Sequence, residues 1–73
     1  MKVMIPKKHF IENLKKVREE LGLTQHQISD KLGIERWRWA CWEYGKSEPN
    51  INMLANISEV TGVSLDRLLT TQL

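Results

Sequence analysis

The sequence predicts an all-α protein that folds as a compact five-helix bundle. Apolar residues recur three or four positions apart, which is the spacing that lines one face of a helix. No segment of useful length alternates apolar and polar residues as a half-buried strand does. The 73 residues make one small domain, residues 1–73. We expect its core over about residues 8–69 and a short basic arm at residues 1–7.

Residues 6–21 are predicted to form the first helix. Pro6 suits a helix start, because the N–H that proline lacks has no intrahelical partner there. Gly22 then ends the helix, since glycine readily adopts the left-handed conformation found at helix C-termini. Four apolar residues fall at spacings of four, three and four, and should form one apolar stripe. They are Phe10, Leu14, Val17 and Leu21.

Two more short helices are predicted within residues 24–44. Thr24 and Gln27 have the spacing of a capping box, which marks the start of the second helix, and Gly33 closes it after little more than two turns. The third helix, at about residues 35–44, stops before Gly45.

The last two helices are predicted from their caps. Asn50 follows the turn at Pro49 and is suited to the N-cap of a helix over residues 51–61, and Ser64 is suited to that of a short final helix. The apolar positions of these helices are Ile51, Leu54, Ile57, Val60, Leu65, Leu68 and Leu69.

Composition excludes several classes of protein. Cys41 is the only cysteine, so an internal disulfide is excluded, and neither it nor the two histidines have the spacing of a zinc site or a nucleophilic catalytic site. No run of about 18 apolar residues predicts a membrane span, and the N-terminal segment lacks the apolar region of a signal peptide. We therefore expect a cytoplasmic, non-enzymatic protein without metal, cofactor or membrane association.

Positive charge gathers in two segments, although the net charge is only +2. Residues 1–18 contain six basic residues and one acidic residue, and residues 31–46 contain four basic and two acidic residues. Such runs are common on solvated helix faces, and they also suit contact with a nucleic acid backbone. Charge alone does not separate these two interpretations.

The second and third helices have the spacing of a helix-turn-helix, two short helices joined by a tight connection that contains glycine. The first of the pair must be short so that the other can project past it, and Gly33 lets the chain turn without a Cβ clash. A helix held this way can enter the major groove of DNA while its neighbour lies across the phosphates. The expected apolar seam between the two helices consists of Ile28, Leu32, Trp39 and Trp42.

Four separated motifs strengthen this interpretation: "LGLTQ", "KLGI", "WEYGKSEP" and "TGVSLDRLL". Over roughly residues 11–69 they fall at the spacing of the Cro and phage-repressor type of helix-turn-helix domain, the XRE-like family, which this sequence resembles. The resemblance implies a lambda-repressor-like domain that acts as a homodimer on a partly palindromic double-stranded DNA operator. It implies a sequence-specific transcriptional regulator, and we expect a repressor.

The resemblance also implies roles for individual residues. The third helix becomes the recognition helix, in which Arg36, Trp37, Arg38 and Cys41 are expected to contact bases. Sequence-independent contacts with phosphates are expected from Gln25, Lys31, Tyr44, Lys46 and Lys8. Arg18 and Glu43 match a pair that joins the first and third helices in many members, and we expect a structural ion pair there.

Helical geometry separates the three tryptophans. At 100° per residue, Trp39 and Trp42 lie about 60° apart on one face of the third helix, and Trp37 lies on the opposite side. Core packing is therefore expected for Trp39 and Trp42. The outward stripe, as we name it, consists of Trp37, Ala40, Cys41 and Tyr44.

An apolar stripe is unusual in a helix that reads DNA, because base contacts commonly come from Arg, Asn or Gln. The family often has small polar residues at the positions of Trp37 and Arg38, and serine or threonine at the N-cap position of Glu35. Trp37 could pack against a thymine methyl group, hold a partner protein, or simply be exposed. The alternative hypothesis is therefore a protein-interaction or antitoxin-like module, in which Trp37, Cys41 and Tyr44 bind a toxin or a regulator.

Overall fold

A computed structural model describes residues 7–70, and five helices occur among them without any strand. The helices are α1 (Lys7–Glu20), α2 (Gln25–Leu32), α3 (Arg36–Glu43), α4 (Ile51–Thr61) and α5 (Leu65–Thr70). The predicted all-α, five-helix fold is confirmed for this part of the chain. The predicted start at Pro6 and the basic arm, except for Lys7, lie outside the described residues.

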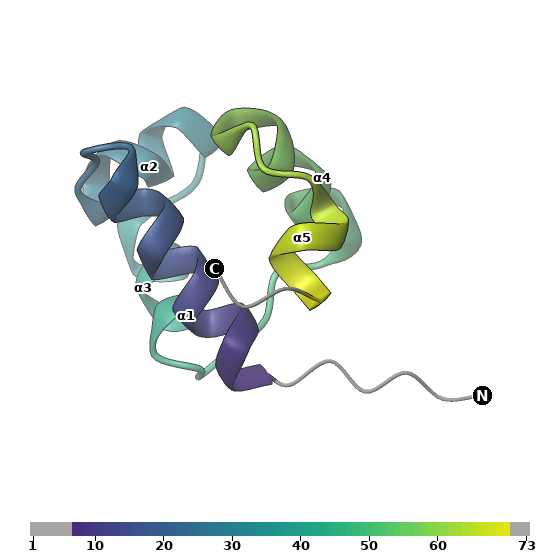
Figure 1. Cartoon of the computed structure of the whole chain (residues 1–73). Coiled ribbons are helices and arrows are strands. Elements are labelled where there is room, and N and C mark those ends of the chain that lie inside the picture. The colour runs from purple at the N-terminus through teal and green to yellow at the C-terminus, as the bar shows by residue number, and fades with distance from the viewer. Residues whose placement is uncertain (1–6, 71–73) are drawn as a thin grey trace.

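The helices surround one apolar core (Figure 1). α1 packs against α3 and α5, α2 packs against α3 and α4, and α4 packs against α5. Every helix contributes at least one buried apolar side chain, so all five helices pack into the same core. These side chains are Phe10, Leu14, Val17, Ile28, Trp39, Trp42, Ile57 and Leu68.

The predicted caps determine where three helices begin. Thr24 Oγ1 accepts the backbone N–H of Gln27 at 3.0 Å, and Gln27 Oε1 accepts the backbone N–H of Thr24 at 2.9 Å, which completes the capping box of α2. Asn50 and Ser64 likewise accept the N–H three residues further on, at 2.9 and 3.3 Å. Each bond satisfies a backbone donor that the helix itself leaves without a partner.

Two residues of the apolar helix spacings lie outside the core. Leu21 is exposed because α1 ends at Glu20 and the chain turns at Gly22, whose φ is 72°, so the helical spacing no longer applies. Ile51 is exposed because it is the first residue of α4. Its side chain leans toward the helix N-terminus, where no preceding helical turn covers it.

Asn13 is a buried polar residue that the sequence patterns do not single out. Its Nδ2 donates a hydrogen bond of 2.9 Å to the backbone carbonyl of Leu68, in the second half of α5. Carbonyls near a helix C-terminus lack intrahelical partners. The bond therefore satisfies a buried acceptor and ties α1 to α5.

Two glycines offer a matched test of backbone strain and packing. Gly33 and Gly45 have left-handed φ values of 70° and 75°, but a Cβ added to Gly45 would lie 3.0 Å from Ile11 Cδ1, whereas one added to Gly33 would meet nothing within 4 Å. We expect Gly33→Ala to lower the free energy of unfolding by about 1 kcal/mol through strain alone. Gly45→Ala should cost about 1 kcal/mol more because of the contact. Urea denaturation measures both, and equal losses would contradict the packing argument.

Candidate nucleic-acid interface

The turn between α2 and α3 is built as the helix-turn-helix pattern predicts. Gly33 adopts the left-handed conformation, and the backbone N–H of Ile34 donates to the carbonyl of Ser29 at 3.0 Å. Ile28 of α2 is fully buried in the core, and Leu32 is partly buried against it. α3 therefore leaves α2 at an angle that the shared apolar side chains hold.

The three tryptophans divide as helical geometry predicts. Trp39 is 1% exposed, Trp42 is also buried, and Trp37 is 64% exposed. The rings of Trp39 and Trp42 meet edge to face, with centroids 5.7 Å apart, an arrangement that aromatic pairs favour. One face of α3 is thus locked into the core and the other is free of it.

The outward stripe is most accessible at its two ends. Trp37 in the first turn of α3 and Tyr44 at its C-cap are 64% and 69% exposed, while Ala40 and Cys41 between them are half-buried. Arg36 beside Trp37 is exposed, and Arg38 is half-buried. The N-terminal turn of α3 therefore presents one apolar and one cationic side chain to solvent.

Glu35 is the N-cap of α3, but its side chain makes no capping hydrogen bond. Its backbone is extended (φ −73°, ψ 146°), as in an ordinary N-cap, whereas its side chain is one methylene longer than the residues that cap well. The carboxylate is left exposed, next to the cationic Arg36.

The residues predicted to meet phosphates lie on several elements. Lys31 is exposed in the last turn of α2 and Lys46 is exposed just after α3, where its backbone N–H donates to the carbonyl of Cys41 at 2.9 Å. Lys8 belongs to α1, but its side chain lies outside the described residues. Gln25, the first residue of α2, is half-buried. That these residues contact phosphate stays a prediction.

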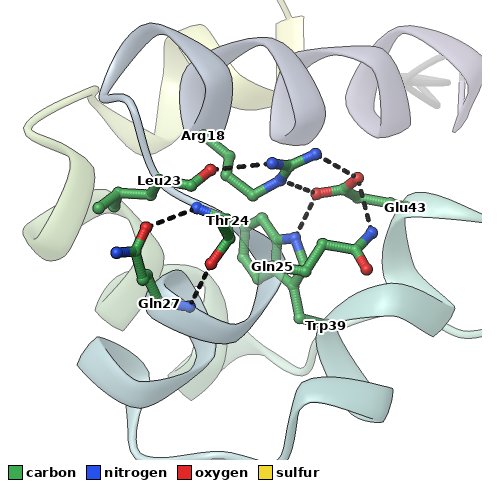
Figure 2. A network of polar contacts seen from close by, with 7 residues as sticks. All are labelled: Arg18, Leu23, Thr24, Gln25, Gln27, Trp39 and Glu43. Atoms are coloured by element: carbon green, nitrogen blue, oxygen red, sulfur yellow. Dashed lines mark hydrogen bonds and ion pairs between the residues drawn. The ribbon is translucent and has the colours of Figure 1, made fainter.

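Glu43 lies at the centre of a polar network that joins three helices (Figure 2). Its Oε2 accepts from Arg18 Nε at 2.7 Å and its Oε1 accepts from Arg18 Nη2 at 3.2 Å. Arg18 Nη1 also donates to the carbonyl of Leu23 at 2.9 Å. Two further donors reach the same carboxylate, Trp39 Nε1 at Oε2 and Gln25 Nε2 at Oε1, the latter at 3.1 Å.

The network keeps both of its charged groups ionised. The Glu43 and Arg18 side chains are only 4% and 12% exposed. Burial raises the pKa of the Glu43 carboxyl, but hydrogen bonds from Arg18, Trp39 and Gln25 outweigh it, so this pKa lies below its usual value. The hydrogen bond to Glu43 raises the pKa of Arg18, against a smaller opposing effect of burial. Both directions stabilise the charged pair, as hydrogen bonds to an ion do.

The family resemblance implied the Arg18–Glu43 pair, and the sequence analysis missed the other donors to this carboxylate. Trp39 and Glu43 are four residues apart on one helix, so their spacing alone could have suggested the contact. Gln25 lies 18 positions from Glu43, and only the packing of α2 against α3 brings them together.

Residues 7–70 contain no helix that is long and apolar enough to cross a membrane. Within the same residues no group of three or more His, Cys, Asp or Glu side chains is placed to hold a metal ion.

Comparison with known proteins relates the chain to transcriptional regulators. It is 50% identical over 60 residues to the uncharacterized HTH-type transcriptional regulator YqaE of Bacillus subtilis (strain 168), covering 82% of this chain and 52% of that protein. It is 38% identical over 61 residues to the HTH-type transcriptional activator BcrR of Enterococcus faecalis, covering 84% of this chain and 30% of that protein. The chain thus spans about half or less of the length of these relatives.

A solved structure shares the fold over nearly its whole length. The P22 c2 repressor protein, crystallised in complex with a synthetic operator, superimposes with a TM-score of 0.80 at 26% identity, covering 85% of this chain and 94% of that one. The lambda-repressor-like fold predicted from the sequence is therefore confirmed.

A family model described as a helix-turn-helix domain matches residues 11–73. Its match begins within α1 and takes in the α2–turn–α3 unit and the network around Glu43. The spacing of the motifs, the observed fold and these relatives agree, and the chain belongs to the helix-turn-helix domain family.

Proposed function

We propose that this chain is a sequence-specific, DNA-binding transcriptional regulator that inserts α3 into the major groove of an operator. The observation that carries the proposal is the division of α3 into two faces. Trp39, Trp42 and Glu43 hold one face in the core, while Arg36 and Trp37 are exposed at the N-terminal turn. Helix-turn-helix proteins contact base edges mainly with the N-terminal residues of the second helix.

We further propose a cytoplasmic, non-enzymatic repressor that acts as a homodimer on a partly palindromic operator. The similarity to the P22 c2 repressor supports this choice, because that similarity extends over 94% of the repressor chain. A repressor needs no contact beyond its operator, because occupying DNA is sufficient to block transcription.

Selection of bound sites from random duplex DNA tests the proposal most directly. We expect an enriched site of two related half-sites about one helical turn apart, as two-fold dimers produce. Affinity for mixed duplex DNA should fall steeply between low and physiological salt, because phosphate contacts release counterions. No binding to mixed duplexes at low salt would refute the proposed function.

Arg36 and Lys46 are expected to contribute to binding in different ways. An arginine can donate two hydrogen bonds to guanine O6 and N7, a contact worth about 1–3 kcal/mol of discrimination, so Arg36→Ala should relax base preference at one position of each half-site. Lys46→Ala should weaken binding to all sequences alike and reduce the salt dependence. Competition assays with single-base operator variants measure both effects. Identical behaviour of the two variants would contradict this division.

A second candidate function rests on the exposure of Trp37 and Tyr44, at 64% and 69%. An apolar stripe bordered by charged residues suits a protein contact, which gives the antitoxin-like or interaction module. Salt separates the two candidates, since an apolar protein contact persists at salt concentrations that dissociate phosphate contacts. Retained affinity for a partner protein together with absent DNA binding would favour this module.

A further inference from the structure

We propose that Glu43 is a positioning residue for DNA binding, which orients the side-chain amide of Gln25 so that an N–H group faces the phosphate backbone. The inference rests on the proposed function, because it needs Gln25 to lie against DNA. It goes further by giving a role in recognition to a carboxylate that is itself buried and touches no DNA.

The orientation of the Gln25 amide follows from the groups that meet at Glu43. The side chain of Gln25 ends in one oxygen, which only accepts hydrogen bonds, and one nitrogen, which carries two N–H donors. An ionised carboxylate only accepts hydrogen bonds. Glu43 Oε1 lies 3.1 Å from Gln25 Nε2, so the nitrogen must be the atom that faces Glu43. The flipped amide would place two acceptors against each other.

The hydrogen bond to Glu43 uses only one of the two N–H donors of the Gln25 side-chain amide. One proton of Gln25 Nε2 is directed at Glu43. The other proton makes no hydrogen bond to any of residues 7–70, which the structure describes. Gln25 is the first residue of α2 and is half-buried, so solvent or a ligand can reach it. A phosphate oxygen can accept a hydrogen bond from this N–H. It can also accept from the neighbouring backbone N–H groups at the N-terminus of α2.

The charge of Glu43 is compensated within the network. A carboxylate close to DNA would repel phosphates, which would oppose binding. Here the guanidinium of Arg18 contacts both oxygens of Glu43, at 2.7 and 3.2 Å, and the Glu43 side chain is 4% exposed. The pair is therefore close to neutral as seen from the DNA, and Glu43 can orient Gln25 without repelling the backbone.

The same carboxylate also accepts from Trp39 Nε1 on the buried face of α3 (Figure 2). The Gln25 amide is thereby held relative to α3 as well as to its own helix. A phosphate contact made through α2 and base contacts made through α3 would then be held in one register.

A double-mutant cycle in DNA affinity tests the proposal. Gln25→Ala should weaken binding to every duplex by about tenfold, the value of one hydrogen bond to a charged group. Glu43→Gln should weaken binding by a similar factor without changing base preference, and should have no further effect in the Gln25→Ala background. Affinities are corrected for the folded fraction measured by circular dichroism. Additive losses in the cycle would overturn the proposal.

Ile57→Val provides a control for lost stability, because it removes one buried methyl group without touching the network. Ile57 is fully buried in α4 and makes no hydrogen bond to the network through its apolar side chain. Its cycle with Gln25→Ala should be additive in DNA affinity. If the cycle of Ile57→Val with Gln25→Ala were as non-additive as the cycle of Glu43→Gln, the loss of DNA affinity would be a general effect of lower stability. That result would also overturn the proposal.

Nuclear magnetic resonance of the wild-type chain avoids any dependence on folding of a variant. In the free protein, one Nε2 proton of Gln25 should be shifted and slow to exchange, and on titration with mixed duplex DNA the other should move. Equal behaviour of the two protons in both states would refute the orienting role. If no duplex binds at all, the proposed function fails, while the spectrum of the free protein still decides whether Glu43 orients the amide.

Discussion

Trp39→Ala is expected to lower the free energy of unfolding by about 3–5 kcal/mol, the usual cost of removing a large aromatic side chain from a core. Trp39 is 1% exposed and packs edge to face on Trp42. A domain of this size has a total stability of roughly 4–11 kcal/mol, so this substitution removes a large part of it. Thermal unfolding followed by circular dichroism measures the loss.

Trp37→Ala is the matched control, because it removes the same side chain two residues away on the same helix. Trp37 is 64% exposed, so its truncation leaves no cavity, and we expect a change within about 0.5 kcal/mol. Similar losses for the two substitutions would mean that α3 does not have one core face and one exposed face.

The second large effect is expected for Glu43→Gln, which should cost about 3 kcal/mol near neutral pH. Removing one partner from a buried ion pair leaves the other charge uncompensated, and the Arg18 side chain is only 12% exposed. Glu59→Gln removes the same charge from an exposed position of α4 and should change stability by less than about 0.5 kcal/mol. Urea denaturation of both variants measures the difference.

The cost of Glu43→Gln should also depend on pH. The pKa of the Glu43 carboxyl is lower in the folded chain than its usual value, so the unfolded chain takes up a proton first as pH falls. The stability that this ionised group contributes is therefore complete above its unfolded pKa, about 4.3, and is lost as pH falls through the lower folded-state pKa. The difference in stability between wild type and Glu43→Gln should narrow on acidification below about pH 4. A difference that stays constant down to about pH 2 would contradict an ionised, hydrogen-bonded Glu43.

The apolar spacing, caps and glycines of the sequence predict most of the fold because they act locally. The capping box of Thr24 and Gln27 and the N-cap at Asn50 place the starts of α2 and α4. The apolar spacing does not account for the exposure of Leu21, which lies past the end of α1, or of Ile51, which is the first residue of α4. A periodic pattern predicts which face of a helix is apolar, and it does not say where neighbouring helices stop covering that face.

The candidate interface was predictable in outline. Helical geometry separates Trp37 from Trp39 and Trp42 on the strength of the sequence alone, since a rotation of about 100° per residue is sufficient to assign opposite faces. The sequence could not say how far each outward residue is covered. Cys41 is half-buried while Tyr44 is 69% exposed, a difference that depends on the packing around α3.

Sequence patterns alone predict the five short helices of residues 7–70, the helix-turn-helix formed by the second and third of them, and the core face of the third helix. These properties arise from interactions between residues three or four positions apart. The folded structure adds to the expected Arg18–Glu43 pair a hydrogen bond from Gln25 to the same carboxylate, which no pattern in the sequence indicated. The partners in these hydrogen bonds are separated by 18 and 25 positions along the chain and lie on different helices. The bonds therefore form only when the helices pack, and helical periodicity does not relate positions so far apart.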